Sequence, residues 1–267
     1  MGKRKVSILE PAATVVAEIA FFIESKGLPQ TARDFVIDSF EFFEKLSDDK
    51  IVNEVNWKIF TNGVSDIASR EYQFVITNQQ AFAAITSQKR VNDKFKNSVM
   101  ELLKPIVKTN DITNYKKQRA IAKTINSKMI DSLLFQYDLD HYEFNSNWNE
   151  YKKVAAAHIK KYVWNSPKEI KSIVLNVMRN STDAASLNQS LSWIKHSNEL
   201  EESYDGILLE ARVQRKLNNI PVAIIITKKA KAFSTQMGWD GKEADKLLAD
   251  LLERKKIAAK PAAKTKK

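Results

Sequence analysis

The sequence predicts an all-α, or nearly all-α, multi-helix globular body. Apolar residues recur at helical spacing in most windows of the chain, and residues that start and stop helices separate these windows. Only two short stretches, 71–77 and 222–227, have the β-branched composition of a strand. Hydrophobic residues make up 43% and charged residues 28% of the 267 positions, which is ordinary for a folded chain.

Start and stop signals delimit three helices in the first part of the chain. Pro11 suits the first position of a helix, and Gly27 lies where a left-handed residue ends it. Thr31 caps a second helix, and a third is expected from Ser47 to Gly63. Each of these windows carries apolar residues at helical spacing, so each is expected to bury one face.

The middle of the chain holds the most regular patterns. Residues 64–88 give no clear prediction, because a strand-like run lies there between helical flanks. Helices are expected over about 88–104 and about 113–136, where apolar residues repeat every third or fourth position. Residues 137–146 are expected to form an acidic loop and hinge, followed by a helix over about 147–164.

The run Ser166-Pro167-Lys168-Glu169 is the clearest local signal in the chain. It combines an N-cap serine, a proline at the first helical position and a glutamate placed for a capping box. Residues 222–227 fit either a buried strand or the start of an apolar helix. The remaining helices are expected at about 167–180, 182–196, 199–218 and from Asp240 onward.

These elements and the composition of the termini predict four segments. The two ends are rich in lysine and poor in apolar residues, which favours disorder in the C-terminal one. The segments are a basic N-terminal arm (1–10), an N-terminal helical lobe (11–136), a C-terminal helical lobe (147–253) and a disordered Lys-rich tail (254–267).

The positive charge is unevenly distributed. Lys and Arg total 43 against 32 Asp and Glu, for a formal net charge of +11, but residues 6–253 carry only +1. Within this body, residues 86–130 carry +8 and residues 151–182 carry +6, and acidic stretches lie between them. A folded body with this alternation is expected to present positive stripes that attract polyanions.

Several functional classes are excluded by what the sequence lacks. Without cysteine there are no disulfides, thiolate metal sites or cysteine nucleophiles, and the six glycines form no phosphate-binding loop. We expect no cofactor. No apolar run reaches the length of a membrane span and no signal peptide is recognisable, so we expect an intracellular, cytoplasmic protein without a membrane partner; a nuclear location stays open.

Basic residues on three expected helices lie opposite the apolar faces and have few acidic neighbours with which to pair. Tyr115 and Trp164, near helix ends, are candidates for exposed rings on which bases stack. The candidate phosphate-contacting residues are Lys89, Arg90, Lys94, Lys96, Lys116, Lys117, Arg119, Lys123, Lys152, Lys153, Lys160 and Lys161.

One stretch has catalytic side chains. Asp138, Asp140, His141 and Glu143 gather three carboxylates and an imidazole in the expected loop, where they could hold Mg²⁺ or Mn²⁺ for phosphoryl chemistry. Their spacing matches no established metal motif. A metal-dependent nuclease-type enzyme is therefore the third hypothesis, and no metal site is assigned.

The favoured hypothesis is a non-catalytic nucleic-acid-binding protein that coats single-stranded RNA by contacting phosphates in a basic groove. RNA is favoured over DNA because no helix-turn-helix or zipper pattern is present. The plan is similar in organisation to helical nucleoproteins of RNA viruses, which have two α-helical lobes with extended termini around a basic groove. The terminal arms could also support self-association. The alternative is a helical scaffold or protein-interaction module.

Overall fold

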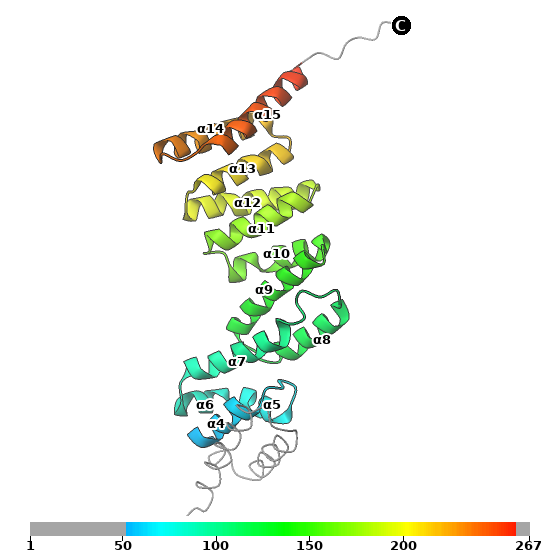
Figure 1. The fold of residues 1–267 in the computed structure, drawn as a ribbon, viewed down its shortest axis with the longest axis vertical. Helices are drawn as coiled ribbons and strands as arrows, with labels where there is room; N and C mark the ends of the chain where they lie inside the picture. The colour runs from blue at the N-terminus through cyan, green and yellow to red at the C-terminus, as the bar shows by residue number, and fades with distance from the viewer. Residues whose placement is uncertain (1–51, 260–267) are drawn as a thin grey trace, which may run out of the picture. The chain divides into compact units, whose positions relative to one another are not determined.

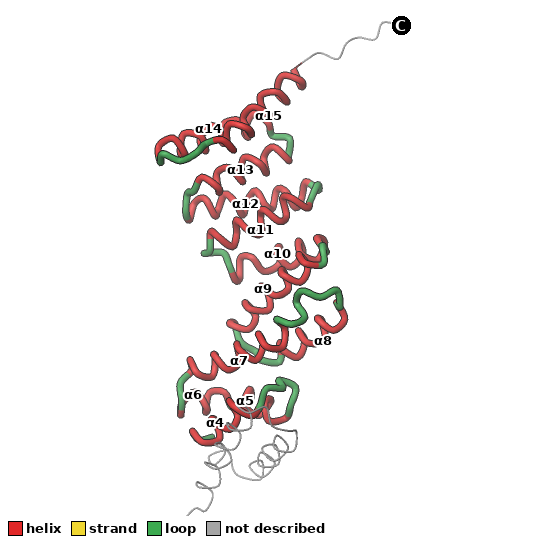
Figure 2. The backbone as a smooth tube through the Cα atoms, viewed as in Figure 1, coloured by secondary structure: helices red, strands yellow, loops and turns green. Residues whose placement is uncertain are grey.

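A computed structural model describes residues 52–259 of the chain. Within this range the chain forms twelve α-helices and no strand, which confirms the predicted fold class (Figures 1 and 2). The chain divides into two compact units, residues 1–137 and 138–267, and each is described by itself. The N-terminal arm and the two helices predicted before Ser47 lie outside the described residues.

The first described helix of the first unit begins later than the sequence predicts. Asn53, and not Ser47, caps α4, because its side chain accepts a hydrogen bond from the Asn56 backbone N–H at 2.9 Å. Figure 1 labels the described helices of this unit, which are α4 (Glu54–Gly63), α5 (Arg70–Thr77), α6 (Gln79–Ile85), α7 (Gln88–Leu103), α8 (Ile112–Lys123) and the first part of α9 (Lys128–Phe144).

The strand-like run at residues 71–77 is helical. The Ser69 side chain caps α5 by accepting from the Tyr72 backbone N–H at 3.2 Å. Tyr72 and Val75, three residues apart, are both fully buried on one face of this helix. Burial of that apolar face outweighs the weak strand preference of the β-branched residues.

Aromatic rings form the centre of the first unit's core. Phe60 of α4 packs edge-on against Tyr72 at a centroid distance of 5.1 Å, and Tyr72 lies 5.9 Å from Phe95 of α7. Burial raises the pKa of the Tyr72 hydroxyl well above its usual range. These aromatic contacts hold α4 and α7 side by side.

The helix predicted over 113–136 is two helices, and the loop predicted over 137–146 is wrong. The Ser127 hydroxyl accepts from the Ile130 backbone N–H at 3.2 Å and starts α9, which continues to Phe144. The acidic stretch is helical because Leu139 and Tyr142 form a buried face with His141. The boundary between the two units falls inside α9, between Tyr137 and Asp138.

The second unit is a succession of helices in which each packs on the next (Figure 1). The predictions for α10, α11 and α12 match within a few residues, and α13 begins five residues later than expected, at its cap Ser203. The helices are α10 (Trp148–Tyr162), α11 (Pro167–Asn180), α12 (Ala184–Leu200), α13 (Tyr204–Lys216), α14 (Ile220–Gln236) and α15 (Lys242–Ala259).

Three details of this unit settle or correct the sequence predictions. Residues 222–227 are helical and belong to α14. Ser166 and Pro167 occupy the N-cap and first positions of α11, but the Ser166 side chain accepts no capping hydrogen bond, so the predicted capping box is absent.

The tail predicted from residue 254 is helical as far as Ala259, because Arg254 bonds back to Asp250 one turn earlier. Residues 260–267 lie outside the described residues.

Three helices of the second unit end in the same backbone motif. Ser146, Asn218 and Gly238 have positive φ values of 52°, 62° and 69° after α9, α13 and α14. In each case the next residue donates its N–H to a carbonyl five residues back, as Asn219 does to Gln214 at 2.9 Å. These left-handed ends reverse the chain sharply and produce the short connections between successive helices.

Candidate nucleic-acid interface

The basic side of α7 is exposed as predicted. Ser87 caps the helix by accepting from the Arg90 backbone N–H at 3.2 Å, and Val91 and Phe95 are buried on the opposite face. Lys89, Arg90 and Lys96 are exposed. Lys89 forms an ion pair with Asp93 at 2.7 Å, whereas the Arg90 and Lys96 side chains have no partner among the described residues.

Arg90 and Lys94 line an open pocket of about 440 Å³ between α4 and α7. The Lys94 ammonium donates to the Thr61 backbone carbonyl at 3.0 Å and lies 5.4 Å from the centre of the Phe60 ring. It is therefore held at the C-terminal end of α4, whose carbonyls favour a positive charge. Lys58 contributes a third cation to the pocket from α4.

The rest of this pocket favours an anionic ligand. Among the described residues that line it, Asp93 is the one carboxylate and is already bonded to Lys89, and the side-chain amides of Asn62 and Asn97 add hydrogen-bond donors. Lys58 has no side-chain partner within the described part of the chain. The sequence analysis missed Lys58 and both asparagines, because nothing in the sequence indicates that α4 and α7 lie side by side.

The α8 residues give a mixed result. Lys116 and Lys117 are exposed without a partner in the range 52–259. Lys123 is ion-paired with Asp131 at the start of α9. Tyr115 is fully buried, so the prediction that its ring is exposed for base stacking is wrong. The tyrosine lies in the first turn of α8, but that turn packs onto the core of the first unit.

Residues 86–130 as a whole carry a large uncompensated charge. They contain eleven basic residues, of which Lys89 and Lys123 have carboxylate partners, Lys94 donates to a backbone carbonyl and the half-buried Arg119 also has an interaction partner. The other seven are exposed and have no side-chain partner among the described residues. They are Arg90, Lys96, Lys104, Lys108, Lys116, Lys117 and Lys128.

The basic residues of α10 are mostly engaged within the second unit. Lys152 donates to Asp183 at 2.8 Å, and Lys153 pairs with Glu150 at 2.7 Å. Asp183 also accepts from the Ser186 backbone N–H at 2.7 Å and so caps α12. These hydrogen bonds, first of all that from Lys152, hold the pKa of Asp183 well below its usual range. Lys152 therefore ties α10 to the start of α12.

The other candidates of this segment lie near the end of α10. Lys160 and Lys161 are in its last turn, and Trp164 follows it. The Lys160 ammonium is 5.4 Å from the Trp164 ring centre, and the Lys161 ammonium is 4.8 Å from that of Tyr162. Trp164 is half-buried and stacks in parallel on His196, with ring centres 3.8 Å apart. His196 covers one face of the indole, which leaves less of it for a base than the sequence predicts.

The four catalytic candidates on α9 do not converge. Asp138 and His141 are buried on one side of the helix, whereas Asp140 and Glu143 are exposed on another. Glu143 accepts a hydrogen bond from the Asn176 amide at 2.7 Å. Asn176 also donates to the Tyr151 hydroxyl at 3.2 Å, and burial raises the pKa of Tyr151 to about 12. No group of three metal-ligating side chains occurs in residues 52–259.

The predicted interface therefore divides into a part in which most cations have no partner among the described residues and a part whose cations are ion-paired or lie over aromatic rings. The first comprises α7, α8 and the segment between them, in the first unit. The second is α10, in the second unit. A single trough shared by all three helices stays a prediction.

Comparisons with known proteins give no family for this chain. No family model, no curated protein and no solved structure matches it. Among the helices of the described range, none combines the length and the apolar composition that crossing a membrane requires.

Proposed function

We propose that the protein binds the sugar–phosphate backbone of nucleic acid through residues 86–130, without reading base sequence. The observation that carries this proposal is the set of seven exposed basic side chains there that lack a partner among the described residues. Like charges that are not neutralised within a fold repel one another, and a polyanion offsets this repulsion. Binding then releases counterions from the nucleic acid.

The pocket between α4 and α7 is the proposed anchoring point for one phosphate. Arg90 offers a planar guanidinium with several N–H donors, and Lys58 adds a second positive charge on a flexible side chain. The Lys94 ammonium, which is held by the Thr61 carbonyl, adds a third positive charge. Lys116 and Lys117 on α8 are exposed as well and add two further cations to the same unit. Arginine and lysine contacts of this kind position a backbone but carry no sequence information.

RNA is the proposed polymer, in line with the absence of a helix-turn-helix or zipper pattern. Base stacking has less support than phosphate contact, since Tyr115 is buried and His196 covers one face of Trp164. Titrations with single-stranded RNA, single-stranded DNA and duplex DNA of equal length separate the two contributions. Stacking predicts that both single strands bind more tightly than the duplex, whereas phosphate contact alone predicts no such preference. The RNA proposal predicts tighter binding of single-stranded RNA than of single-stranded DNA.

A double variant tests the anchoring pocket. Lys58→Gln with Arg90→Gln should weaken binding of a labelled 20-mer RNA and reduce the slope of log K against log salt by about 1.4, because each phosphate contact contributes about 0.7 for a single strand. The control is Lys168→Gln with Lys195→Gln, two exposed lysines of the second unit that have no partner among the described residues. Equal slopes for the two variants would contradict the proposal.

A further inference from the structure

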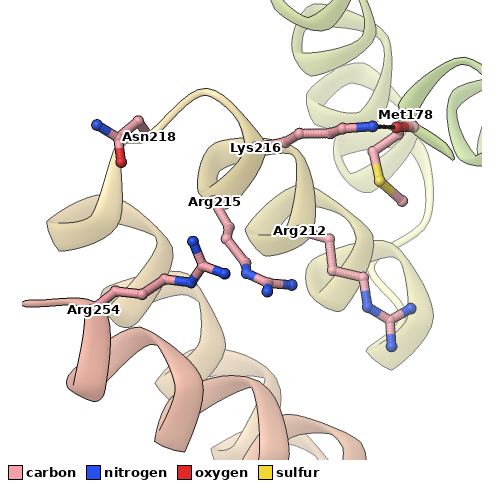
Figure 3. A pocket seen from close by; sticks show the side chains of 6 residues that line it. All are labelled: Met178, Arg212, Arg215, Lys216, Asn218 and Arg254. Carbon is pink, nitrogen blue, oxygen red and sulfur yellow. Dashed lines mark hydrogen bonds between the residues drawn. The ribbon is translucent and has the colours of Figure 1, made fainter. Parts of the chain in front are cut away.

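The second unit contains a pocket whose walls are unusually rich in arginine. It has a volume of about 520 Å³ and lies where α13, α15 and the end of α11 meet. Arg212, Arg215 and Lys216 line it from α13, and Arg254 lines it from α15 (Figure 3). No carboxylate occurs among the described residues that line the pocket. The sequence analysis assigned no role to any of these residues.

Two of the arginines share a single carboxylate. The Arg215 Nε lies 2.8 Å from an Asp250 oxygen, and the Arg254 Nε donates to the same carboxylate at 3.0 and 3.2 Å. Both contacts use only Nε–H, so the four terminal N–H donors of each guanidinium are not used by Asp250. Figure 3 shows the two guanidinium groups directed toward each other across the space between α13 and α15.

The other two cations complete the charge of the pocket. Arg212 pairs with Glu243 of α15 at 2.5 Å. Lys216 donates to the Met178 carbonyl and, at 3.4 Å, to that of Arg179, and thereby offsets the negative end of α11. Three of the four basic side chains contact the two carboxylates and Lys216 contacts only backbone carbonyls, so four positive and two negative charges leave a formal excess of two positive charges around the pocket.

From this arrangement we infer that the pocket binds the phosphate group of a small phosphomonoester. A phosphomonoester carries a charge of about −1.5 to −2 at neutral pH, which matches the formal excess. Its three terminal oxygens suit the unused guanidinium donors of Arg215 and Arg254, which bind phosphate in a bidentate manner. The volume is within the range of about 300–1,000 Å³ that is typical of small-molecule sites, so the ester group also fits.

This site is separate from the proposed nucleic-acid interface. It lies in the second unit, and its ligand carries two charges on one phosphorus rather than one charge per nucleotide. A phosphodiester, with a single negative charge, should therefore bind it more weakly. Neither proposal depends on the other, and their failures are distinguishable because they concern different residues and different ligands.

The test is a titration of the full chain with glycerol 3-phosphate, followed by the arginine Nε–Hε signals in NMR spectra. We expect saturable shifts of the Arg215 and Arg254 signals, and affinity at least about tenfold lower for dimethyl phosphate, a diester. Arg215→Gln should reduce glycerol 3-phosphate affinity by about tenfold or more, as expected for the loss of charge-assisted hydrogen bonds. Lys195→Gln, an exposed charge on α12, is the control and should change the affinity less than twofold.

A second variant keeps the inference testable if Arg215→Gln unfolds the protein. Asp250→Asn removes the carboxylate that competes with phosphate for both guanidinium groups, so it should raise glycerol 3-phosphate affinity by about threefold to tenfold. If the arginines only connect α13 to α15, Asp250→Asn lowers thermal stability without creating tighter binding. That result, or the absence of saturable shifts in the wild-type chain, would overturn the inference.

Discussion

Two basic segments that look alike in the sequence differ in the structure. Residues 86–130 contain seven exposed basic side chains without a partner among the described residues, out of eleven. In residues 151–182 only Lys168 and Arg179 are in this state, out of seven. The others are ion-paired, hydrogen-bonded or placed over aromatic rings.

The two segments differ in whether the fold brings carboxylates from elsewhere in the sequence to their basic side chains. Asp183, which neutralises Lys152, is 31 residues away in sequence and belongs to the acidic stretch that follows the basic one. The helix turn from α11 to α12 brings it back to α10. A charge block is therefore a sound guide to a binding surface only when the fold brings no carboxylates to it.

Removing five uncompensated charges should have the largest effect. Replacement of five cations of the first segment with Gln should lower RNA affinity on the order of a hundredfold at low salt, because each removes a phosphate contact. Fluorescence anisotropy with a labelled 20-mer measures this. The replaced residues are Arg90, Lys96, Lys104, Lys116 and Lys117.

The matched control removes five charges from the second segment. It should reduce affinity less than about tenfold, since two of these side chains are ion-paired and two lie over aromatic rings, and only Lys168 has no partner among the described residues. An equal loss in both variants would show that net charge, and not pairing, determines binding. The replaced residues are Lys152, Lys153, Lys160, Lys161 and Lys168.

Thermal stability should show the opposite ranking. Lys152→Gln removes the partner of Asp183 and should lower the melting temperature by about 2 °C, a modest value because the pair is partly exposed. Lys116→Gln removes a charge that has no partner among the described residues and is repelled by its basic neighbours, so it should leave the melting temperature unchanged or slightly higher. Differential scanning calorimetry distinguishes the two, and a larger loss for Lys116→Gln would contradict the assignment.

Acid should weaken the second unit through Asp183. Its pKa is depressed in the folded state, so it stabilises the fold above its ordinary unfolded value of about 3.9, and this stabilisation is lost as the pH falls through the lower folded value. Asp183→Asn should be less stable at pH 7 and should lose stability less steeply below about pH 4. Denaturant titrations across pH 2 to 7 provide the measurement. Glu253→Gln, which removes an exposed carboxylate without a partner among the described residues, should behave like the wild type.

The smallest effect is expected at the aromatic residue. Trp164→Phe should change RNA affinity by less than about twofold, because one face of the indole is covered by His196 and a stacked base contributes about 1–3 kcal/mol only when the ring is available. A loss of tenfold or more in the same anisotropy assay would show that Trp164 stacks on a base of the bound RNA.

The sequence predicts the helices well where local signals act alone. The bounds of α7 are right within one residue, because a serine cap precedes the helix and Pro105 follows it. The prediction fails at α9, where Asp138 and His141 are buried. Polar residues suggest a loop when read locally, and only tertiary packing shows that their helix face is enclosed.

The candidate site is predictable only in part, for the same reason. The exposed side of α7 follows from helical periodicity. Three other contacts join residues that are more than thirty positions apart in the sequence. They are Lys58 beside Arg90, Lys152 paired with Asp183, and Arg215 facing Arg254. Contacts of this kind depend on how helices pack, and no local pattern encodes them.

The salt dependence of RNA binding by the full chain tests directly whether residues 86–130 contact the phosphates. The slope of log K against log salt is measured for the wild type and for the first five-residue variant, so that contributions from the basic ends of the chain cancel in the difference. Five lost phosphate contacts predict a slope that is shallower by about 3.5. Parallel lines for the two proteins would contradict the claim that residues 86–130 contact the phosphates.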